Sequence, residues 1–299
     1  MILLTGASGP TGSVVLKHFV QAGLQVRAFV HRAESAAKVR AAGAAEAFIG
    51  DIEQRDDVMA AMQGVQQVYH ACPRFSEREV QIVEWMIDAA RASPAFRQFI
   101  YHSVLHAQND AMPHHRDKRI AESRLLDSGL AYTILQPTQY FQVSTRDWKG
   151  IVASGELATP FGAGQKLSLV NVEDIAAAAT IMATQPGWTG GCFELMSGDS
   201  YTRHEMAALM TEALRKSAGW PAERAVHAVV EDVAHWRDHQ RNTGAFSETQ
   251  IARAEKMFVQ YSTHGLSGGN GRVLGMILGR APSRYADFIA RMAAERPQG

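Results

Sequence analysis

The first twelve residues constrain the fold more than any other part of the chain, because an apolar run ends there in three regularly spaced glycines. Met1–Thr5 has the composition of a buried strand, and Gly6, Gly9 and Gly12 follow it. Gly6 permits a tight turn, Gly9 lets the backbone approach a pyrophosphate, and Gly12 lets the next helix pack closely on the sheet. Pro10 is tolerated in a first helical turn, where its missing amide hydrogen has no partner. The pattern predicts a dinucleotide-binding turn at the positive end of a helix dipole.

Short β-branched segments alternate with amphipathic ones after this turn. The expected strands are 24–30, 44–50, 67–71, 96–103 and 132–136, and the expected helices are 13–22, 35–42, 56–62, 77–92, 118–128 and 172–184. With the first strand, this series favours an α/β fold with a doubly wound parallel Rossmann sheet. Residues 148–165 carry several glycines and are expected to form loops with short strands, and residues 262–275 a flexible loop.

The change in regularity past residue 142 predicts two domains. The first is a nucleotide-binding Rossmann domain over residues 1–148, to which about 168–184 returns. The second is a smaller C-terminal α+β lobe for substrate, over residues 149–167 and 185–299.

Composition excludes several classes of function. The 30 basic and 30 acidic side chains cancel, so neither a nucleic-acid backbone nor an anionic membrane surface is an expected partner. The first apolar segment is too short for a signal peptide or a membrane span. The two cysteines, Cys72 and Cys192, form no metal-binding pattern, which favours a reduced cytoplasmic setting and no structural metal.

The end of the second expected strand bears on cofactor choice. It carries no carboxylate for the ribose hydroxyls, and Arg32 stands there instead. A guanidinium can bind a 2′-phosphate with paired hydrogen bonds, which favours NADPH; the alternative is a solvated surface arginine. Asp51, after the third strand, either accepts a hydrogen bond from the adenine amino group or caps a helix.

Residues 112–118 indicate the chemistry. If a helix begins at Pro113, His114 and Lys118 lie one turn apart on one face. This spacing is that of a dehydrogenase Tyr-x-x-x-Lys pair with histidine in the tyrosine position. Lys118 can bind the nicotinamide ribose and stabilise a developing oxyanion. A histidine, with a reference pKa of about 6.5, needs little tuning to donate a proton near neutral pH, although the helix N-terminus at His114 favours the neutral imidazole.

The neighbouring polar residues have simpler interpretations. His102, His106, His114 and His115 can be polar loop residues or an opportunistic metal site, but no acidic ligand at suitable spacing supports a metal. Ser103 either faces substrate or bonds to the loop backbone, and we do not expect it to be catalytic.

Several segments in order resemble the NmrA-like family of atypical short-chain dehydrogenases/reductases, within the NAD(P)-binding Rossmann superfamily. The segments are Thr5–Gly12, Arg32, Gly50-Asp51, His102–His106, His114-His115-x-x-Lys118, Tyr132–Pro137, Val172–Ala176, and Leu278–Pro282 followed by Asp287-Phe288. The match extends over nearly the whole chain. The Gln136-Pro137 and Lys118 segments are its more specific parts.

The resemblance implies an extended Rossmann domain with a small C-terminal lobe, and NADPH as the preferred cofactor. Members of the family are either reductases of quinones, dyes or phenylpropanoids, with a lysine matching Lys118 in the active site, or sensors that bind NADP and regulate a transcription factor by protein contact. This chain departs from the ordinary pattern in lacking a tyrosine at position 114. It also has Cys72-Pro73-Arg74 where the loop over the nicotinamide is expected.

Together these observations predict an NADPH-dependent reductase of a small conjugated or aromatic carbonyl, quinone or phenylpropanoid-like substrate. A non-catalytic NADP(H) sensor is the alternative, and a homodimer stays open. The expected catalytic residues are Lys118 and His114. The expected cofactor-binding residues are Gly6, Ser8, Gly9, Pro10, Thr11, Gly12, Arg32, Asp51, Ile52, Ala71, Cys72, Ser103, Lys118 and Pro137, and the expected substrate-binding residues are Tyr140, Phe141, Trp148 and Phe161.

Overall fold

The chain divides into two compact units in the computed structural model, which describes residues 1–295. Unit 1 comprises Met1–Pro137, Val172–Glu194 and Ile277–Gly279. Unit 2 comprises Thr138–Asn171, Leu195–Met276 and residues 280–295. The sequence predicts that the first domain ends at residue 148 and resumes at about residue 168. In the structure, unit 1 ends its first segment at Pro137 and resumes at Val172.

Unit 1 is built around a seven-stranded sheet in the order β10-β6-β5-β4-β1-β2-β3. Its strands are β1 (Ile2–Leu4), β2 (Val26–Val30), β3 (Glu46–Ile49), β4 (Gln67–His70), β5 (Gln98–His102), β6 (Tyr132–Pro137) and β10 (Gly191–Leu195). The pairings among β1 to β6 are all parallel. This order reverses direction at β1, which makes the sheet doubly wound, as the sequence predicts.

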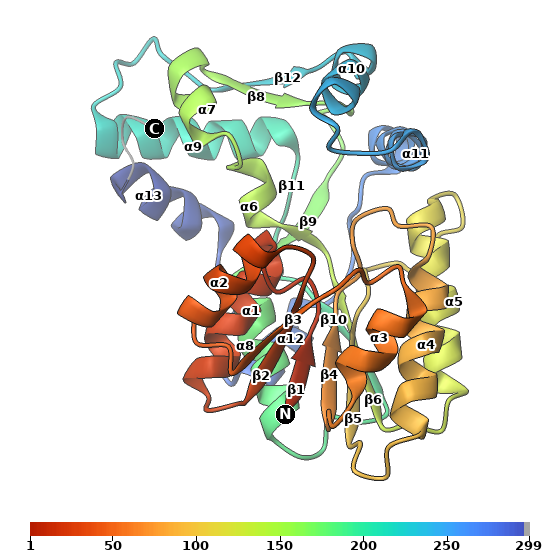
Figure 1. Ribbon diagram of the computed structural model, residues 1–299. Helices are drawn as coiled ribbons and strands as arrows, with labels where there is room; N and C mark the ends of the chain where they lie inside the picture. The colour runs from red at the N-terminus through yellow and green to blue at the C-terminus, as the bar shows by residue number, and fades with distance from the viewer. Residues whose placement is uncertain (296–299) are drawn as a thin grey trace. The chain divides into compact units, whose positions relative to one another are not determined.

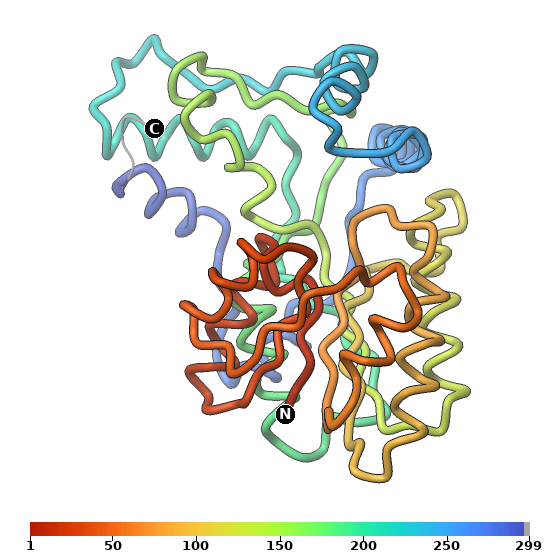
Figure 2. The backbone as a smooth tube through the Cα atoms, in the orientation of Figure 1, coloured from red at the N-terminus to blue at the C-terminus, as the bar shows by residue number. Residues whose placement is uncertain are grey.

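Helices cover both faces of this sheet (Figure 1). They are α1 (Pro10–Gln21), α2 (Ala33–Ala41), α3 (Arg55–Met62), α4 (Glu79–Arg91), α5 (Pro113–Leu126) and α8 (Val172–Thr184). Helices α1, α2 and α8 lie on one face, and α3, α4 and α5 on the other. Figure 2 shows α8, in green, returning to lie beside α1, in red, where His18 Nε2 is 2.7 Å from Glu173 Oε2.

The core of unit 1 follows from the apolar spacing in its elements. In α4, Ile82, Val83 and Met86 recur at helical intervals and are fully buried. They pack on buried residues of the central strands such as Leu3 and Phe99. This packing fixes the strand ends, and loops at the carboxyl edge of such a sheet form its binding site.

Unit 2 holds smaller sheets and most of the C-terminal helices. Its strands are β7 (Gln139–Tyr140), β8 (Glu156–Thr159), β9 (Leu167–Val170), β11 (Ser200–Tyr201) and β12 (His227–Val230). Its helices are α6 (Phe141–Ser144), α7 (Trp148–Ser154), α9 (Arg203–Ala218), α10 (Val233–Thr243), α11 (Glu248–His264) and α13 (Tyr285–Glu295), and α12 (Gly271–Leu278) crosses a boundary between the units. Strand β9 pairs with β7 and β11, and β8 pairs with β12.

Two segments expected to form loops contain helices, although the short strand expected within residues 148–165 is present as β8. Residues 148–165 contain helix α7, because the Asp147 side chain accepts a hydrogen bond from Gly150 N–H at the start and Gly155 takes the left-handed conformation at the end. Residues 262–275 contain the start of α12, whose Val273, Leu274 and Ile277 give it an apolar face despite the nearby glycines.

Candidate cofactor-binding and catalytic site

The glycine turn after β1 has the geometry of an anion site. Gly6 has φ +65°, in the region that favours glycine, and its carbonyl accepts the Gly9 N–H at 2.9 Å. Helix α1 begins at Pro10 with Gly9 as its N-cap, so no side chain caps the helix. The amides of the first turn are therefore open to a bound anion, which the helix dipole also favours.

Gly12 fixes how closely α1 approaches this turn. A Cβ atom at position 12 would lie 2.0 Å from the Gly6 carbonyl oxygen and 2.6 Å from its carbon. Neither atom can move without distorting the turn, so a side chain cannot be accommodated. At Gly9 the corresponding distance to Gly6 O is 3.2 Å, which is a milder restriction.

Thr5 ties the turn to the end of β4. Its Oγ1 accepts the Ala71 N–H at 2.9 Å and lies 3.0 Å from His70 Nδ1. Ala71 O is consequently 3.4 Å from the position of a Cβ on Gly6. The structure thus brings the predicted residues Gly6 and Ala71 together, and Cys72 follows Ala71 in the chain. It adds Thr5 and His70, which were not predicted as site residues from the sequence.

Arg32 and Asp51 follow the adjacent strands β2 and β3 at the same edge of the sheet. Arg32 is exposed at the N-cap position of α2, and it is available to an anion. The Asp51 carboxylate accepts the Glu53 N–H at 2.9 Å, whereas the N-cap of α3 is Gln54. Asp51 therefore stabilises its own turn and does not cap α3. Ile52 beside it is half-buried.

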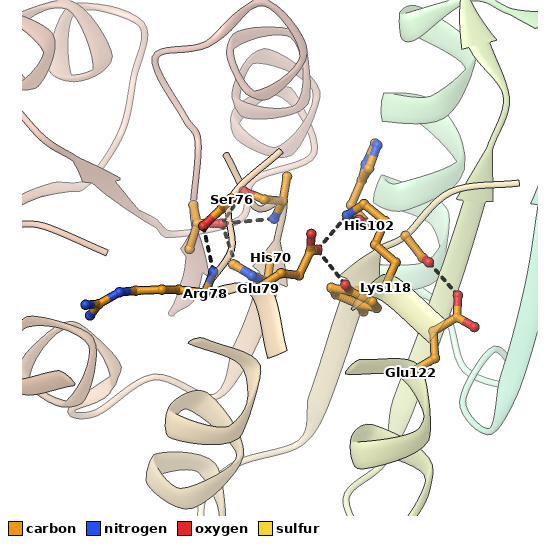
Figure 3. A network of polar contacts seen from close by, with 11 residues as sticks. His70, Ser76, Arg78, Glu79, His102, Lys118 and Glu122 are labelled. Carbon is orange, nitrogen blue, oxygen red and sulfur yellow. Dashed lines mark hydrogen bonds and ion pairs between the residues drawn. The ribbon is translucent and has the colours of Figure 1, made fainter. Parts of the chain in front are cut away.

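Lys118 lies in a buried polar network at the ends of β4 and β5 (Figure 3). Helix α5 begins at Pro113, so His114 and Lys118 are one turn apart as expected. Lys118 Nζ donates to Glu79 Oε1 at 2.6 Å and to His102 O at 3.2 Å. An ammonium group has three N–H donors, so one stays available to a ligand. The Lys118 side chain is 14% exposed, which leaves access to it.

Glu79 is the centre of this network, and no sequence pattern predicts it. Its side chain is 3% exposed, and Oε1 also accepts the hydroxyl of Tyr101 at 2.6 Å. The Tyr101 ring centroid is 5.3 Å from Lys118 Nζ. The helical pattern of the sequence places Glu79 at the start of α4 and predicts nothing about its partners. Those partners, Tyr101 and Lys118, come from elements that are distant in the sequence.

The charges in the network follow from burial. Burial and the adjacent Glu79 raise the pKa of Tyr101 well above its usual range, so Tyr101 stays a neutral donor. Burial, with a smaller contribution from Lys118, lowers the pKa of His70 and of His102 to about 3. Both histidines are therefore neutral near pH 7. His70, His102 and Tyr101 therefore add no charge next to the Lys118–Glu79 ion pair.

The remaining residues near Lys118 have defined partners. The Ser103 hydroxyl donates to Glu122, which also accepts a hydrogen bond from Gln136 Nε2 at 2.8 Å. This ties β5 and β6, which ends at Pro137, to α5. Contact of Ser103 with the cofactor or the substrate stays a prediction. The half-buried His114 ring stacks edge-on against Phe75, with centroids 4.9 Å apart.

Two further groups are held in unreactive forms. Burial lowers the pKa of His115 to about 4, and its Nδ1 lies 2.9 Å from His106 O. Burial and Glu79 raise the pKa of the Cys72 thiol well above its usual range, so Cys72 stays a thiol. Within residues 1–295, no three histidine, cysteine or acidic side chains are grouped as metal ligands, and no helix is long and apolar enough to cross a membrane.

The residues expected to bind substrate all lie in unit 2, and most are buried. Phe141 is fully buried against Tyr285 at 5.3 Å between ring centroids, and Trp148 is buried in α7. Phe161 is buried beside Arg203, whereas Tyr140 is half-buried. The contact of all four side chains with a substrate stays a prediction.

The sheet order, the open glycine turn and its tight contact with α1 define a Rossmann nucleotide-binding protein. A family model described as NAD(P)H-binding matches residues 6–186, and the chain belongs to this family. The predicted fold and cofactor class are thereby confirmed.

Similar proteins share the whole length of the chain. An NAD(P)H azoreductase of Xenophilus azovorans is 27% identical over 296 residues, which cover 98% of each chain. The NADPH-dependent quinone oxidoreductase QOR2 of Escherichia coli, solved with NADPH, has a TM-score of 0.78 and 22% identity over 98% of this chain and 99% of that one. NmrA, a negative transcriptional regulator solved with NADP, has a TM-score of 0.74 and 16% identity over 97% and 94%. The fold is thus that of NmrA-like proteins, as the sequence indicates.

Proposed function

We propose that this protein is an NADPH-dependent reductase that delivers hydride to a small conjugated or aromatic carbonyl, quinone or phenylpropanoid-like acceptor. The observation that carries the proposal is Lys118, a partly exposed ammonium held by Glu79 at the carboxyl edge of an NAD(P)H-binding sheet. Similarity over 98% of the chain to an NAD(P)H azoreductase supports an oxidoreductase.

The residues of the glycine turn would bind and orient the cofactor. The first-turn amides of α1 suit its pyrophosphate, and Gly12 keeps them close to the sheet. The exposed guanidinium of Arg32 suits a 2′-phosphate, which is the basis for choosing NADPH over NADH. When bound, the cofactor supplies hydride to the acceptor.

Lys118 would act on both the cofactor and the acceptor. Two of its N–H groups are engaged by Glu79 and His102 O, and the third would donate to the ribose or to the reacting oxygen. A carbonyl or quinone that receives hydride develops negative charge on oxygen and must then gain a proton. The ammonium stabilises that charge, and either Lys118 or His114 can deliver the proton.

The test is oxidation of NADPH, followed by the loss of its absorbance, with quinones, azo dyes and conjugated phenolic carbonyls as acceptors. We expect turnover with at least one class, and a fall of about a hundredfold or more in kcat for Lys118→Ala, because its charge acts at the transition state. Lys216→Ala, which removes an exposed lysine of α9, is the control and should keep full activity. Unchanged turnover in Lys118→Ala would exclude the assigned role.

A redox sensor is the second candidate, and the shared fold with the NmrA regulator favours it. A sensor binds the nucleotide without consuming it. Saturable binding of NADPH together with no oxidation across all three acceptor classes would support the sensor over the reductase.

A further inference from the structure

Strand β12 of unit 2 has one edge that no other strand covers. Among residues 1–295, β8 is the one strand that pairs with it (Figure 1). The His227 N–H donates to Gly155 O at 2.8 Å, and the Glu231 N–H donates to Thr159 O at 2.8 Å. The opposite edge of such a strand presents unpaired N–H and C=O groups on which another strand can form.

Ala228 and Val230 carry these unpaired groups. Alternate residues of a strand direct their backbone groups to the same neighbour, and His227 and Glu231 face β8. The backbone groups of Ala228 and Val230 therefore point to the uncovered edge. The Val230 side chain is 57% exposed, and β12 lacks the proline or lysine that commonly blocks pairing at an edge.

A groove with a volume of about 920 Å³ lies beside this edge, between β12 and α9. It is lined by side chains of α9, from His204 to Lys216, and by residues 225–228, and no residue of β8 lines it. The Val226 N–H donates to Thr211 Oγ1 of α9 at 2.8 Å, so α9 covers the edge only where β12 begins. The groove leaves room beside Ala228 for a side chain from another strand.

The sequence of β12 makes this edge complementary to a second copy of itself. Two antiparallel copies centred on Val229 place Ala228 of each copy opposite Val230 of the partner subunit, and these residues then exchange four backbone hydrogen bonds. The exposed Val230 side chain thereby meets Ala228 of the partner subunit, at the groove. The same centre places His227 opposite Glu231 of the partner subunit twice. An imidazole N–H can donate to a carboxylate, and such cross-strand pairs stabilise a sheet.

We propose that the chain forms a two-fold symmetric dimer in which β12 pairs with β12 of a second copy. The result is a continuous four-stranded sheet in the order β8-β12-β12-β8. One self-complementary surface is sufficient for such an interface. The interface is small, so we expect a dissociation constant of about 1–100 μM, with His227 exposed in the monomer at lower concentrations. The dimer does not depend on the proposed reductase activity.

Sedimentation velocity over about 1–300 μM protein tests the dimer and should show a monomer that becomes a dimer as concentration rises. Val230→Lys places an ammonium group on the edge of each copy and should raise the dissociation constant by about tenfold or more. Val259→Lys makes the same change at a 68% exposed position of α11 and should leave the dimer unchanged. A dimer that Val230→Lys does not weaken would contradict the proposal. A chain that stays monomeric throughout would also contradict it, and would favour a strand of another protein at this edge.

Charge exchange tests the register of the two strands. His227→Glu places two carboxylates opposite each other at both ends of the pairing and should weaken the dimer about tenfold. His227 is exposed and Glu231 is half-buried, so neither change should unfold the chain. Adding Glu231→Lys to His227→Glu creates an opposite-charge pair at each end and should restore the dimer. Failure of this second substitution to restore it would contradict the register.

Disulfide formation tests the two-fold centre. In Val229→Cys the two cysteines face each other at a Cα separation of about 4.5 Å, which a disulfide can span. In Val230→Cys they are offset by two residues, about 7 Å along the strand, which a disulfide cannot span. Mild oxidation should cross-link Val229→Cys far more than Val230→Cys, with Cys192→Ser in both because Cys192 is exposed. Equal cross-linking of the two variants would overturn the centre at Val229.

Discussion

Glu79 shows how one buried side chain can organise a site. It accepts hydrogen bonds from both Lys118 and Tyr101, and among these three groups it holds the negative charge that faces the ammonium. Buried pairs contribute little over an apolar replacement, but breaking one leaves the partner's charge uncompensated. The residue thus positions Lys118 without itself needing to touch a substrate.

We expect Glu79→Gln to destabilise unit 1 by about 3–5 kcal/mol, because the shape is kept and the Lys118 charge loses its partner. Urea unfolding measures this change. Glu84→Gln is the matched control on the same helix, since Glu84 is 45% exposed and its pair with Arg124 is worth about 1 kcal/mol or less. Equal stability losses for the two variants would mean that the Glu79–Lys118 pair is not effectively buried.

At the scale of elements, the contact between α1 and the glycine turn carries the argument for nucleotide binding. Gly12→Ala places a methyl group 2.0 Å from the Gly6 carbonyl oxygen. Such overpacking costs about 1–3 kcal/mol, and we expect the displaced helix to lose at least tenfold in NADPH affinity by calorimetry. Gly164→Ala meets open space and should bind as the unaltered protein does. Wild-type affinity in Gly12→Ala would show that α1 can shift without harm to the site.

Strongly periodic elements were predictable from the sequence, whereas helices α7 and α12, which lie in segments with several glycines, were not. Strand β2 was expected at 24–30 and occupies Val26–Val30, and α8 begins and ends at the expected residues 172 and 184. Helices α7 and α12 both lie among glycines, which typically indicate loops, although Asp147 is a residue type that favours the N-cap position of α7. The seventh strand, β10, was missed because its short sequence has no clear alternation of apolar and polar residues.

The candidate site was predictable where spacing along the chain defines it. His114 and Lys118 follow from a helix starting at Pro113. Glu79, Tyr101 and Glu122 join the network through tertiary packing of α4, β5 and α5, and no local pattern reports such contacts.

At the scale of the whole molecule, buried histidines link stability to pH. The pKa values of His70 and His102 fall to about 3 and that of His115 to about 4, whereas an unfolded histidine titrates near 6.5. Below about pH 6.5 the unfolded chain binds more protons than the folded chain, so stability is lost as pH falls. As the pH falls from about 7.5 to about 5.5, each of the three histidines should lower the free energy of unfolding by about 1.4 kcal/mol, or by about 4 kcal/mol together.

Urea unfolding at several pH values checks this expectation. His70→Gln should reduce the acid-dependent loss by about 1.4 kcal/mol. His227→Gln, at an exposed position, should leave it unchanged. A flat stability profile over this range would show that the three histidines are protonated without penalty.

Binding of the cofactor is the property on which the whole account depends. Isothermal calorimetry with NADPH and NADH, on the unaltered protein and on Arg32→Asp, measures it most directly. We predict saturable binding with NADPH preferred by about tenfold or more, and a preference lost or inverted in Arg32→Asp, where a carboxylate repels the 2′-phosphate. No saturation with either nucleotide would contradict the account as a whole, and an unchanged preference in Arg32→Asp would contradict its assignment of the phosphate site.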